Sequence, residues 1–170
     1  MELKEFVRDI PDFPKKRVIY KDITPLLLSP KAVNQALEQF LENIGQQPID
    51  KVVGIESRGF FFATLLAQRL DAGFIPVRKP GKLPASTHAQ EYELEYGSDT
   101  LEIHKDAIQP GDKVLLHDDV LATGGTAAAT CKLIEKCGGE VVLCNFLIEL
   151  DFLKGEEQLK TYTVHSLMHY

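Results

Sequence analysis

"LLHDDVLATGGTAAAT", residues 115–130, joins an apolar run, two adjacent carboxylates and a turn of small residues that opens into alanines. Residues 112–119 form an apolar run that predicts a buried strand. Residues 126–139 carry apolar side chains at helical spacing and end on a glycine pair, which commonly stops a helix. The stretch therefore predicts a strand, a tight turn and a helix in immediate succession.

The same alternation extends along the chain. Residues 50–57, 72–79 and 140–150 predict further buried strands, and the densely apolar segment 60–70 predicts a buried helix. Strands that alternate with helices need crossover connections, so we expect an α/β fold with a parallel sheet flanked by helices. Such sheets bind ligands beyond the carboxyl ends of their strands. The segments that follow the strands are residues 56–59, 78–82 and 118–126.

Residues 91–104 follow a different pattern, because polar and apolar side chains alternate strictly. Tyr92, Leu94 and Tyr96 share one face, the intervening glutamates share the other, and residues 97–99 predict a turn. This pattern predicts a β-hairpin with one solvated face. A segment rich in proline and glycine precedes it, so we expect residues 80–104 to form a flexible, functional flap.

Composition limits the possible functions. The chain has 170 residues, of which 44% are hydrophobic and 26% charged, and this predicts a single globular domain over residues 1–170. A net charge of −6 argues against nucleic-acid binding but allows a small anionic ligand held by local cations. We expect no membrane segment, because no run approaches ~18 apolar residues. Three cysteines without metal-ligand spacing favour a reducing, cytoplasmic location.

The quoted turn has the chemistry of an anion site. Glycines allow close backbone approach, and the first amides of the following helix favour a phosphate. A tight strand-to-helix connection explains the turn equally well. The adjacent Asp118 and Asp119 favour the ligand, because paired like charges destabilise a strand end unless sugar hydroxyls, a metal or a cation satisfy them. A ligand with a phosphate beside ribose hydroxyls fits both features, and a solvated acidic pair is the alternative.

The thirteen residues "VLLHDDVLATGGT" (114–126) resemble the phosphoribosyl-pyrophosphate (PRPP) signature of type I phosphoribosyltransferases. Five more stretches, in family order and covering nearly the whole chain, narrow the resemblance to the adenine phosphoribosyltransferases. They are "RDIPDFP" (8–14), "YKDITPLL" (20–27), "GIESRGF" (54–60), "VRKPGKLP" (77–84) and "YELEYGSDTLEIH" (92–104). The resemblance implies a parallel sheet with a small N-terminal hood, residues 1–35, and a homodimer that makes AMP and pyrophosphate from adenine and PRPP.

The resemblance also implies residue roles. Asp118 and Asp119 would bind the ribose hydroxyls. The 5′-phosphate would lie on the turn formed by Ala122, Thr123, Gly124, Gly125 and Thr126. Pyrophosphate would be bound by Arg58, Arg78, Lys79 and Lys82, with Tyr96 closing the flap over it. An arginine suits bidentate phosphate contacts, although a solvated loop or surface is the alternative for these cations.

Glu95 resembles the flap glutamate that handles the proton at N7 of the purine. Spacing alone does not choose among Glu91, Glu93 and Glu95, and the "LEYG" match selects Glu95. The resemblance places the purine against Ile19 and Tyr20, whose backbone groups would distinguish adenine from a 6-oxo purine. Lys21 would add a phosphate or base contact. The alternative is that these are packing residues of the N-terminal segment.

The sequence departs from the family pattern at two places, and the resemblance also implies a metal. Lys16-Arg17 stands where many members have Pro-Gly, and His117 stands where they have valine or isoleucine. We interpret His117 as a histidine satisfied by a neighbouring backbone group rather than as a group that tunes Asp118. Mg²⁺ is expected to bind mainly through oxygens of the substrate, so no protein metal ligand is assigned.

Two other functions compete with adenine salvage. A phosphoribosyltransferase for a 6-oxo purine such as xanthine would need a side chain that donates to O6, and no matching motif provides one. A PRPP-sensing regulator would keep the 118–126 motif, tolerate loss of the flap glutamate and usually carry a DNA-binding segment. The chain has both "LEYG" and "ESRG" and is acidic, so the enzyme is the preferred interpretation.

Overall fold

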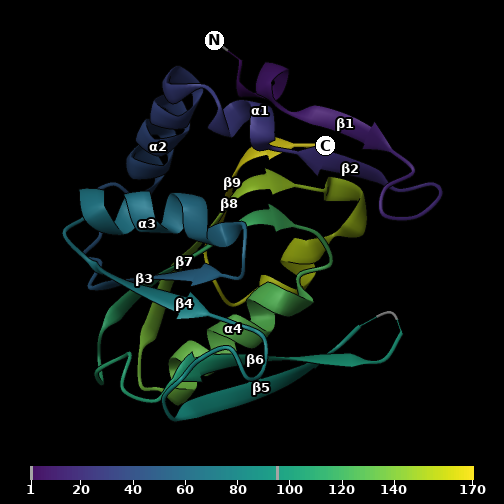
Figure 1. Ribbon diagram of the computed structural model, residues 1–170. Coiled ribbons are helices and arrows are strands. Elements are labelled where there is room, and N and C mark those ends of the chain that lie inside the picture. The colour runs from purple at the N-terminus through teal and green to yellow at the C-terminus, as the bar shows by residue number, and fades with distance from the viewer. Residues whose placement is uncertain (1, 95) are drawn as a thin grey trace. The chain divides into compact units, whose positions relative to one another are not determined.

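The structure is a computed structural model that describes residues 2–94 and 96–170 (Figure 1). The chain forms two compact units, Met1–Glu42 and Asn43–Tyr170. The larger unit contains the central sheet and most of the predicted site. The predicted catalytic Glu95 lies outside the described residues. No helix among the described residues has both the length and the apolar character needed to cross a membrane.

The central sheet has five strands in the order β4-β3-β7-β8-β9, and all neighbouring pairs are parallel. The strands are β3 (Lys51–Ile55), β4 (Gly73–Val77), β7 (Lys113–Leu121), β8 (Glu140–Glu149) and β9 (Val164–His169). The predicted parallel sheet is confirmed, and β9 adds a strand that was not predicted. The central strands are buried nearly throughout, which explains their continuous apolar sequences.

Two crossover helices cover the sheet. Helix α3 (Gly59–Arg69) packs on β3, β4 and β7, whereas α4 (Gly125–Lys136) packs on β7 and β8. The connections from β3 to β4 and from β7 to β8 run in opposite directions across the sheet. Right-handed crossovers in opposite directions put the helices on opposite faces, as Figure 1 shows for α3 and α4. The carboxyl ends of β3 and β7 therefore form the topological switch point, where such sheets bind ligands.

The predicted hairpin is formed by the antiparallel strands β5 (Thr87–Glu93) and β6 (Ser98–His104). It begins at Thr87 rather than at residue 91, and Ser98 and Asp99 pair with Glu93 and Tyr92 rather than forming the turn. The boundaries differ from the prediction because the antiparallel pairing continues to Glu93, the last residue of β5. The hairpin lies along α4 (Figure 1), and its Leu101 and Ile103 are buried in the core.

A hydrophobic cluster of buried residues fills much of the core of the larger unit. It combines sheet residues such as Val53, Leu116 and Phe146 with Ile134 from α4 and Ile103 from the hairpin. All three cysteines are free thiols. Two short 3-10 helices, η2 (Asp151–Leu153) and η3 (Gly155–Leu159), connect β8 to β9. Burial of the apolar strands and helix faces thus stabilises this unit without a disulfide.

The N-terminal unit contains η1 (Leu3–Phe6), the antiparallel pair β1 (Arg8–Pro11) and β2 (Ile19–Asp22), α1 (Thr24–Leu27) and most of α2 (Pro30–Ile44). Helix α2 was not predicted, although its buried residues recur at helical spacing and proline occupies its first position. Arg17, where the resemblance implies a glycine, has a φ of 67° and donates its backbone N–H to Asp12 Oδ1 at 2.7 Å. Arg17 therefore adopts the left-handed conformation that glycine adopts without strain.

Candidate active site

The carboxylate pair lies inside β7 rather than at its end. Pairing with β8 continues through Leu121, which lies opposite Glu149, so the strand extends two residues beyond Asp119. Asp119 is only 4% exposed, and Asp118 Oδ1 accepts the backbone N–H of Asp119 at 2.9 Å. A β-carbon on Gly59 would lie 2.8 Å from Asp118 Oδ1. Glycine at the start of α3 therefore allows the helix to approach Asp118.

Arg58 joins the two strands at the switch point. It follows β3 and precedes α3, and its Nε lies 2.9 Å from Asp119 Oδ2. The contact places the positive charge of Arg58 beside the carboxylate of Asp119, which is largely buried within the sheet. From its sequence context Arg58 is predicted to bind pyrophosphate, and that role stays a prediction. What the structure adds is its position beside Asp119.

Burial raises the pKa of Asp118 well above its ordinary value, and the negative charge of Asp119 adds to the rise. Burial also raises the pKa of Asp119, although the Arg58 guanidinium partly offsets this effect. The pair therefore holds a proton more readily than solvated carboxyl groups do. Carboxyl groups with raised pKa values cluster at functional sites.

The carboxylate pair leads to a prediction about stability. A carboxyl group whose pKa is higher in the folded state than in the unfolded state destabilises the fold when it is ionised. This destabilisation is complete above the folded pKa and disappears as the pH falls from the folded pKa to the unfolded pKa. Replacing Asp118 by asparagine removes one charge and keeps the oxygen that accepts the Asp119 N–H. We expect Asp118→Asn to raise the melting temperature at pH 7 by roughly 2–4 °C, corresponding to about 1 kcal/mol.

Thermal unfolding at pH 7 and pH 5 checks this expectation. The difference between wild type and Asp118→Asn should shrink at pH 5, because protonation relieves the same repulsion in the wild type. Asp106→Asn is the matched control, since Asp106 is exposed in a turn. A lower melting temperature for Asp118→Asn than for Asp106→Asn at pH 7 would contradict the electrostatic argument.

The glycine turn is held by a second backbone segment. Gly124 has a φ of 87°, and a β-carbon there would lie 2.3 Å from the carbonyl oxygen of Gly155. A β-carbon on Gly155 would in turn lie 2.4 Å from the carbonyl oxygen of Ala122. Both glycines are therefore required, Gly124 by its conformation and both by the close contact of the turn with the start of η3.

The turn and Asp118 share one small cavity. Its volume is about 70 Å³, and its lining includes Asp118, Ala122, Thr123, Gly124 and Thr126. Gly125 is the first residue of α4, whose first amides have no acceptor within the helix. These amides and the helix dipole favour an anion at this end. The structure thus brings Asp118 and the predicted phosphate turn together.

Three of the predicted basic residues, Arg78, Lys79 and Lys82, hydrogen-bond to the carboxylate of Glu56. Glu56 accepts Arg78 Nε at 3.3 Å, the backbone N–H of Lys79 at 2.9 Å and the ammonium group of Lys82. The Lys79 ammonium group donates to Asp99. Burial would raise the pKa of Glu56, but the hydrogen bonds from Lys82 and Lys79 and the charge of Arg78 outweigh it and lower that pKa. A phosphate ligand would therefore have to compete with Glu56 and Asp99 for these cations.

Tyr92 links the hairpin to the phosphate turn. Thr126 Oγ1 donates to Tyr92 Oη at 3.4 Å, and Tyr92 Oη donates to Asp99 Oδ2 at 3.4 Å. Because Asp99 also accepts from Lys79, this chain of contacts connects α4, the hairpin and the basic loop. A cavity of about 320 Å³ is lined by residues of both β5 and α4, including Tyr92 and Gly125.

Glu56, Tyr92 and Asp99 were not predicted as site residues from the sequence. Glu56 belongs to the "ESRG" segment that follows a strand, which was a usable signal for its location but not for its partners. Tyr92 was placed on a hairpin face, but alternation does not identify what that face contacts. His117 is fully buried, and its Nδ1 lies 2.7 Å from Asn145 Oδ1, so the histidine has a side-chain partner. Burial lowers the pKa of His117 to about 4, so the ring is neutral near pH 7.

The surroundings of four other predicted residues can be described one by one. Tyr96 is 83% exposed at the hairpin tip. In the N-terminal unit, Ile19 is 55% exposed, and the Tyr20 ring meets the Phe13 ring edge-on with centroids 5.1 Å apart. Lys21 Nζ lies 2.7 Å from Asp9 Oδ1. The assigned roles of Tyr96 and of the β2 residues therefore stay predictions.

A parallel sheet with a carboxylate pair and a glycine turn at its switch point defines a class of sites that bind a sugar phosphate. Residues 20–165 match the family described as "Phosphoribosyl transferase domain". This match covers most of the chain and agrees with the predicted type I phosphoribosyltransferase fold. The chain belongs to the phosphoribosyltransferase family.

The names of individual relatives are more specific than the name of the family. The chain is 72% identical over 170 residues to the adenine phosphoribosyltransferase of Christiangramia forsetii, covering 100% of this chain and 99% of that protein. It resembles the crystal structure of the Rhodothermus marinus adenine phosphoribosyltransferase, with a TM-score of 0.95, 56% identity and coverage of 99% and 96% of the two chains. The Saccharomyces cerevisiae enzyme, solved with adenine and D-2,5-dideoxy-2,5-imino-altritol 1,6-bisphosphate, gives a TM-score of 0.92, 41% identity and coverage of 96% and 95%.

Proposed function

We propose that the protein is an adenine phosphoribosyltransferase of purine salvage. It transfers the 5-phosphoribosyl group of PRPP to N9 of adenine and releases pyrophosphate, giving AMP. The observation that carries the proposal is the cavity shared by Asp118 and the glycine turn at the switch point, because it pairs acceptors for sugar hydroxyls with donors for a phosphate. Relatives that are named adenine phosphoribosyltransferases support the choice of base.

The ribose 5-phosphate end of PRPP would bind first to preformed groups. Asp118 and Asp119 accept from the 2′- and 3′-hydroxyls, and residues 122–126 bind the 5′-phosphate through backbone amides and threonine hydroxyls. Binding hydroxyls offsets the repulsion between the two carboxylates. This exchange explains why two buried negative charges adjoin a turn that is suited to an anion.

The pyrophosphate end of PRPP would bind to the cations near the switch point. Arg58, Arg78, Lys79 and Lys82 lie in the two loops that follow β3 and β4, and their present partners are carboxylates that an incoming pyrophosphate can replace. Positive charge beside the leaving group stabilises the negative charge that develops on it as the ribosyl bond breaks. Tyr96 would close over this end and help to exclude water.

Mg²⁺ dependence is part of the proposal. The carboxylate pair beside the proposed ribose and phosphate site would suit hydrogen bonds to the water ligands of a hydrated Mg²⁺. This ion prefers phosphate oxygens and water to a full set of protein ligands. When bound through PRPP, Mg²⁺ supplies further positive charge at pyrophosphate. Asp118 and Asp119 would accept hydrogen bonds from its water ligands.

Proton transfer and base selection complete the mechanism. Glu95 acts as the general base that takes the proton from adenine N7 while N9 attacks C1′ of the ribose. Backbone groups of Ile19 and Tyr20 pair with the adenine edge, Lys21 adds a polar contact, and a 6-oxo purine would leave those groups unsatisfied. These roles rest on the sequence motifs, and the adenine held by the yeast relative supports the choice of base.

We also propose a homodimer in the cytoplasm. Phe61 and Leu65 lie one turn apart on α3 and are 46% and 39% exposed, which gives an apolar contact for a second copy. The three free thiols favour a reducing compartment.

Pyrophosphate release from PRPP and Mg²⁺ tests the proposed reaction. Adenine, hypoxanthine, guanine, xanthine and uracil are compared as acceptors, and we expect release with adenine alone. Release with hypoxanthine or xanthine instead would assign the protein to a 6-oxo purine. PRPP binding without release for any base would indicate a PRPP sensor and overturn the enzymatic proposal.

A further inference from the structure

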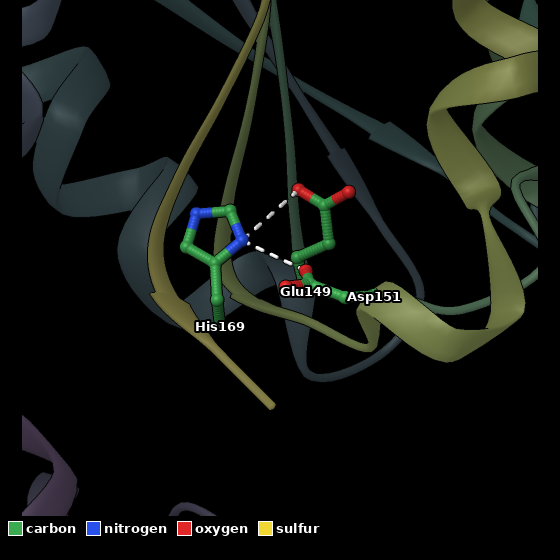
Figure 2. Close-up of side chains that lie close together, drawn as sticks. All are labelled: Glu149, Asp151 and His169. Atoms are coloured by element: carbon green, nitrogen blue, oxygen red, sulfur yellow. Dashed lines mark hydrogen bonds and ion pairs between the residues drawn. The ribbon is translucent and has the colours of Figure 1, made fainter.

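Three metal-ligating side chains meet at the carboxyl ends of β8 and β9. Figure 2 shows the ring of His169 turned toward the carboxylates of Glu149 and Asp151. His169 Nδ1 lies 2.8 Å from Asp151 Oδ1 and 3.9 Å from Glu149 Oε2. One ligand atom from each residue lies within 4.8 Å of the other two. The mechanism proposed for this protein uses none of these three residues.

The backbone holds the three residues in fixed positions. Glu149 and His169 lie directly opposite each other on neighbouring parallel strands. Tyr170 donates its N–H to the Glu149 carbonyl at 3.0 Å, and Asp151 donates its N–H to the Tyr170 carbonyl at 2.9 Å. The cluster is therefore built on paired strands and the start of η2, where ligand positions are more precise than on a free loop.

Glu149 is the buried member of the cluster. Its side chain is 6% exposed, and its Oε2 accepts the Ser166 hydroxyl at 2.7 Å, which fixes the orientation of the carboxylate. Within the described part of the chain, no lysine or arginine forms an ion pair with Glu149, and its cationic partner is His169 at 3.9 Å. A buried carboxylate normally has a close cation or a metal. The exposed Asp151 and His169 leave an ion free access from solvent.

We propose that Glu149, Asp151 and His169 bind one divalent transition-metal ion of the Zn²⁺ type. The ligands would be Glu149 Oε2, Asp151 Oδ1 and His169 Nδ1, with water completing the coordination. Bonds of about 2.0–2.2 Å in a tetrahedral site place ligand atoms roughly 3.3–3.6 Å apart. The separations of His169 Nδ1 from the two carboxylate oxygens, 2.8 Å and 3.9 Å, lie on either side of that range. A nitrogen ligand with two carboxylates suits Zn²⁺ or Co²⁺ better than Mg²⁺, which prefers oxygen ligands.

The ion would connect the sheet edge to the segment behind the phosphate turn. Leu150, between two of the ligands, donates its N–H to the Leu121 carbonyl at 3.0 Å. Gly155, a few residues later, contacts the backbone of Ala122 and Gly124. The site is separate from Mg²⁺ carried by the substrate, and it stands whether or not the proposed reaction is correct.

Co²⁺ titration of the metal-free, tag-free protein at pH 8 tests the site, because the visible spectrum of Co²⁺ reports coordination directly. The variants are His169→Gln and Asp151→Asn. His165→Gln is the matched control, since His165 is an exposed histidine on the same strand with no carboxylate partner in the described ranges. We expect one Co²⁺ per chain, displaced by Zn²⁺, and a loss of affinity of at least about tenfold in both ligand variants but not in the control.

Thermal unfolding without metal verifies that each variant is folded before titration. Zn²⁺ should raise the melting temperature of the wild type and of His165→Gln, and leave that of His169→Gln unchanged. The proposal is overturned if the wild type binds no Co²⁺, or if His169→Gln binds it as tightly as His165→Gln does.

Discussion

Replacing Gly124 by alanine is expected to lower kcat/KM for PRPP by at least about a hundredfold, because a shift of about 1 Å in a substrate-binding group can cost that much. Two effects act together at this position. The φ of 87° disfavours any side chain, and the new methyl group would lie 2.3 Å from the Gly155 carbonyl oxygen. Since that oxygen belongs to backbone, the turn itself has to move. We expect the variant to lose about 2–4 kcal/mol of stability as well.

Gly111→Ala separates these two effects. Gly111 has a φ of 89°, but a β-carbon there meets nothing within 4 Å. Alanine at residue 111 should therefore cost only the conformational term of about 1–2 kcal/mol and leave kcat/KM unchanged. Initial rates and denaturant unfolding are measured for both variants. Equal losses of activity in the two would show that contact with Gly155 does not maintain the phosphate turn.

Glu95→Gln is expected to lower kcat by roughly 10²–10⁴-fold, the usual contribution of a positioned general base. The amide keeps the size of the side chain but cannot take the proton from adenine. The KM for PRPP should change little, because the carboxylate is not assigned to PRPP. In the wild type, kcat should rise with pH as a carboxyl group ionises. This rise should be absent from the variant.

Glu93→Gln is the control for this variant, because it removes an exposed negative charge from the same hairpin. If Glu95 acts only through the charge of the flap, both variants will have similar rates. A wild-type kcat in Glu95→Gln would remove Glu95 from the chemical step while leaving the PRPP site intact.

The sequence predicted most of the sheet because its strands are short apolar runs separated by turns and helices. β9 was missed because "VHSLMH" mixes polar and apolar residues over only six positions at the sheet edge. β7 was predicted to end at its carboxylates, but pairing with β8 extends it to Leu121. Charge at a strand end is therefore a weaker boundary signal than the length of the partner strand.

The site was predictable where its parts are contiguous. Residues 118–126 carry acceptors, glycines and a helix start in one stretch, and their local geometry follows from that order. The contacts of Glu56 with Arg78 and of Tyr92 with Thr126 span 22 and 34 residues along the chain. No local pattern encodes such pairs, because the packing of α4 and the loops against the sheet creates them.

The rate of AMP formation from adenine, PRPP and Mg²⁺, compared between the wild type and the Asp118→Asn/Asp119→Asn double variant, is the decisive measurement. The wild type should form AMP and pyrophosphate in equal amounts. The double variant should remain folded, yet its kcat/KM for PRPP should fall by at least about a hundredfold, since two charged acceptors for ribose hydroxyls are lost. AMP formation at the wild-type rate by the double variant would contradict a PRPP site at the carboxyl end of β7.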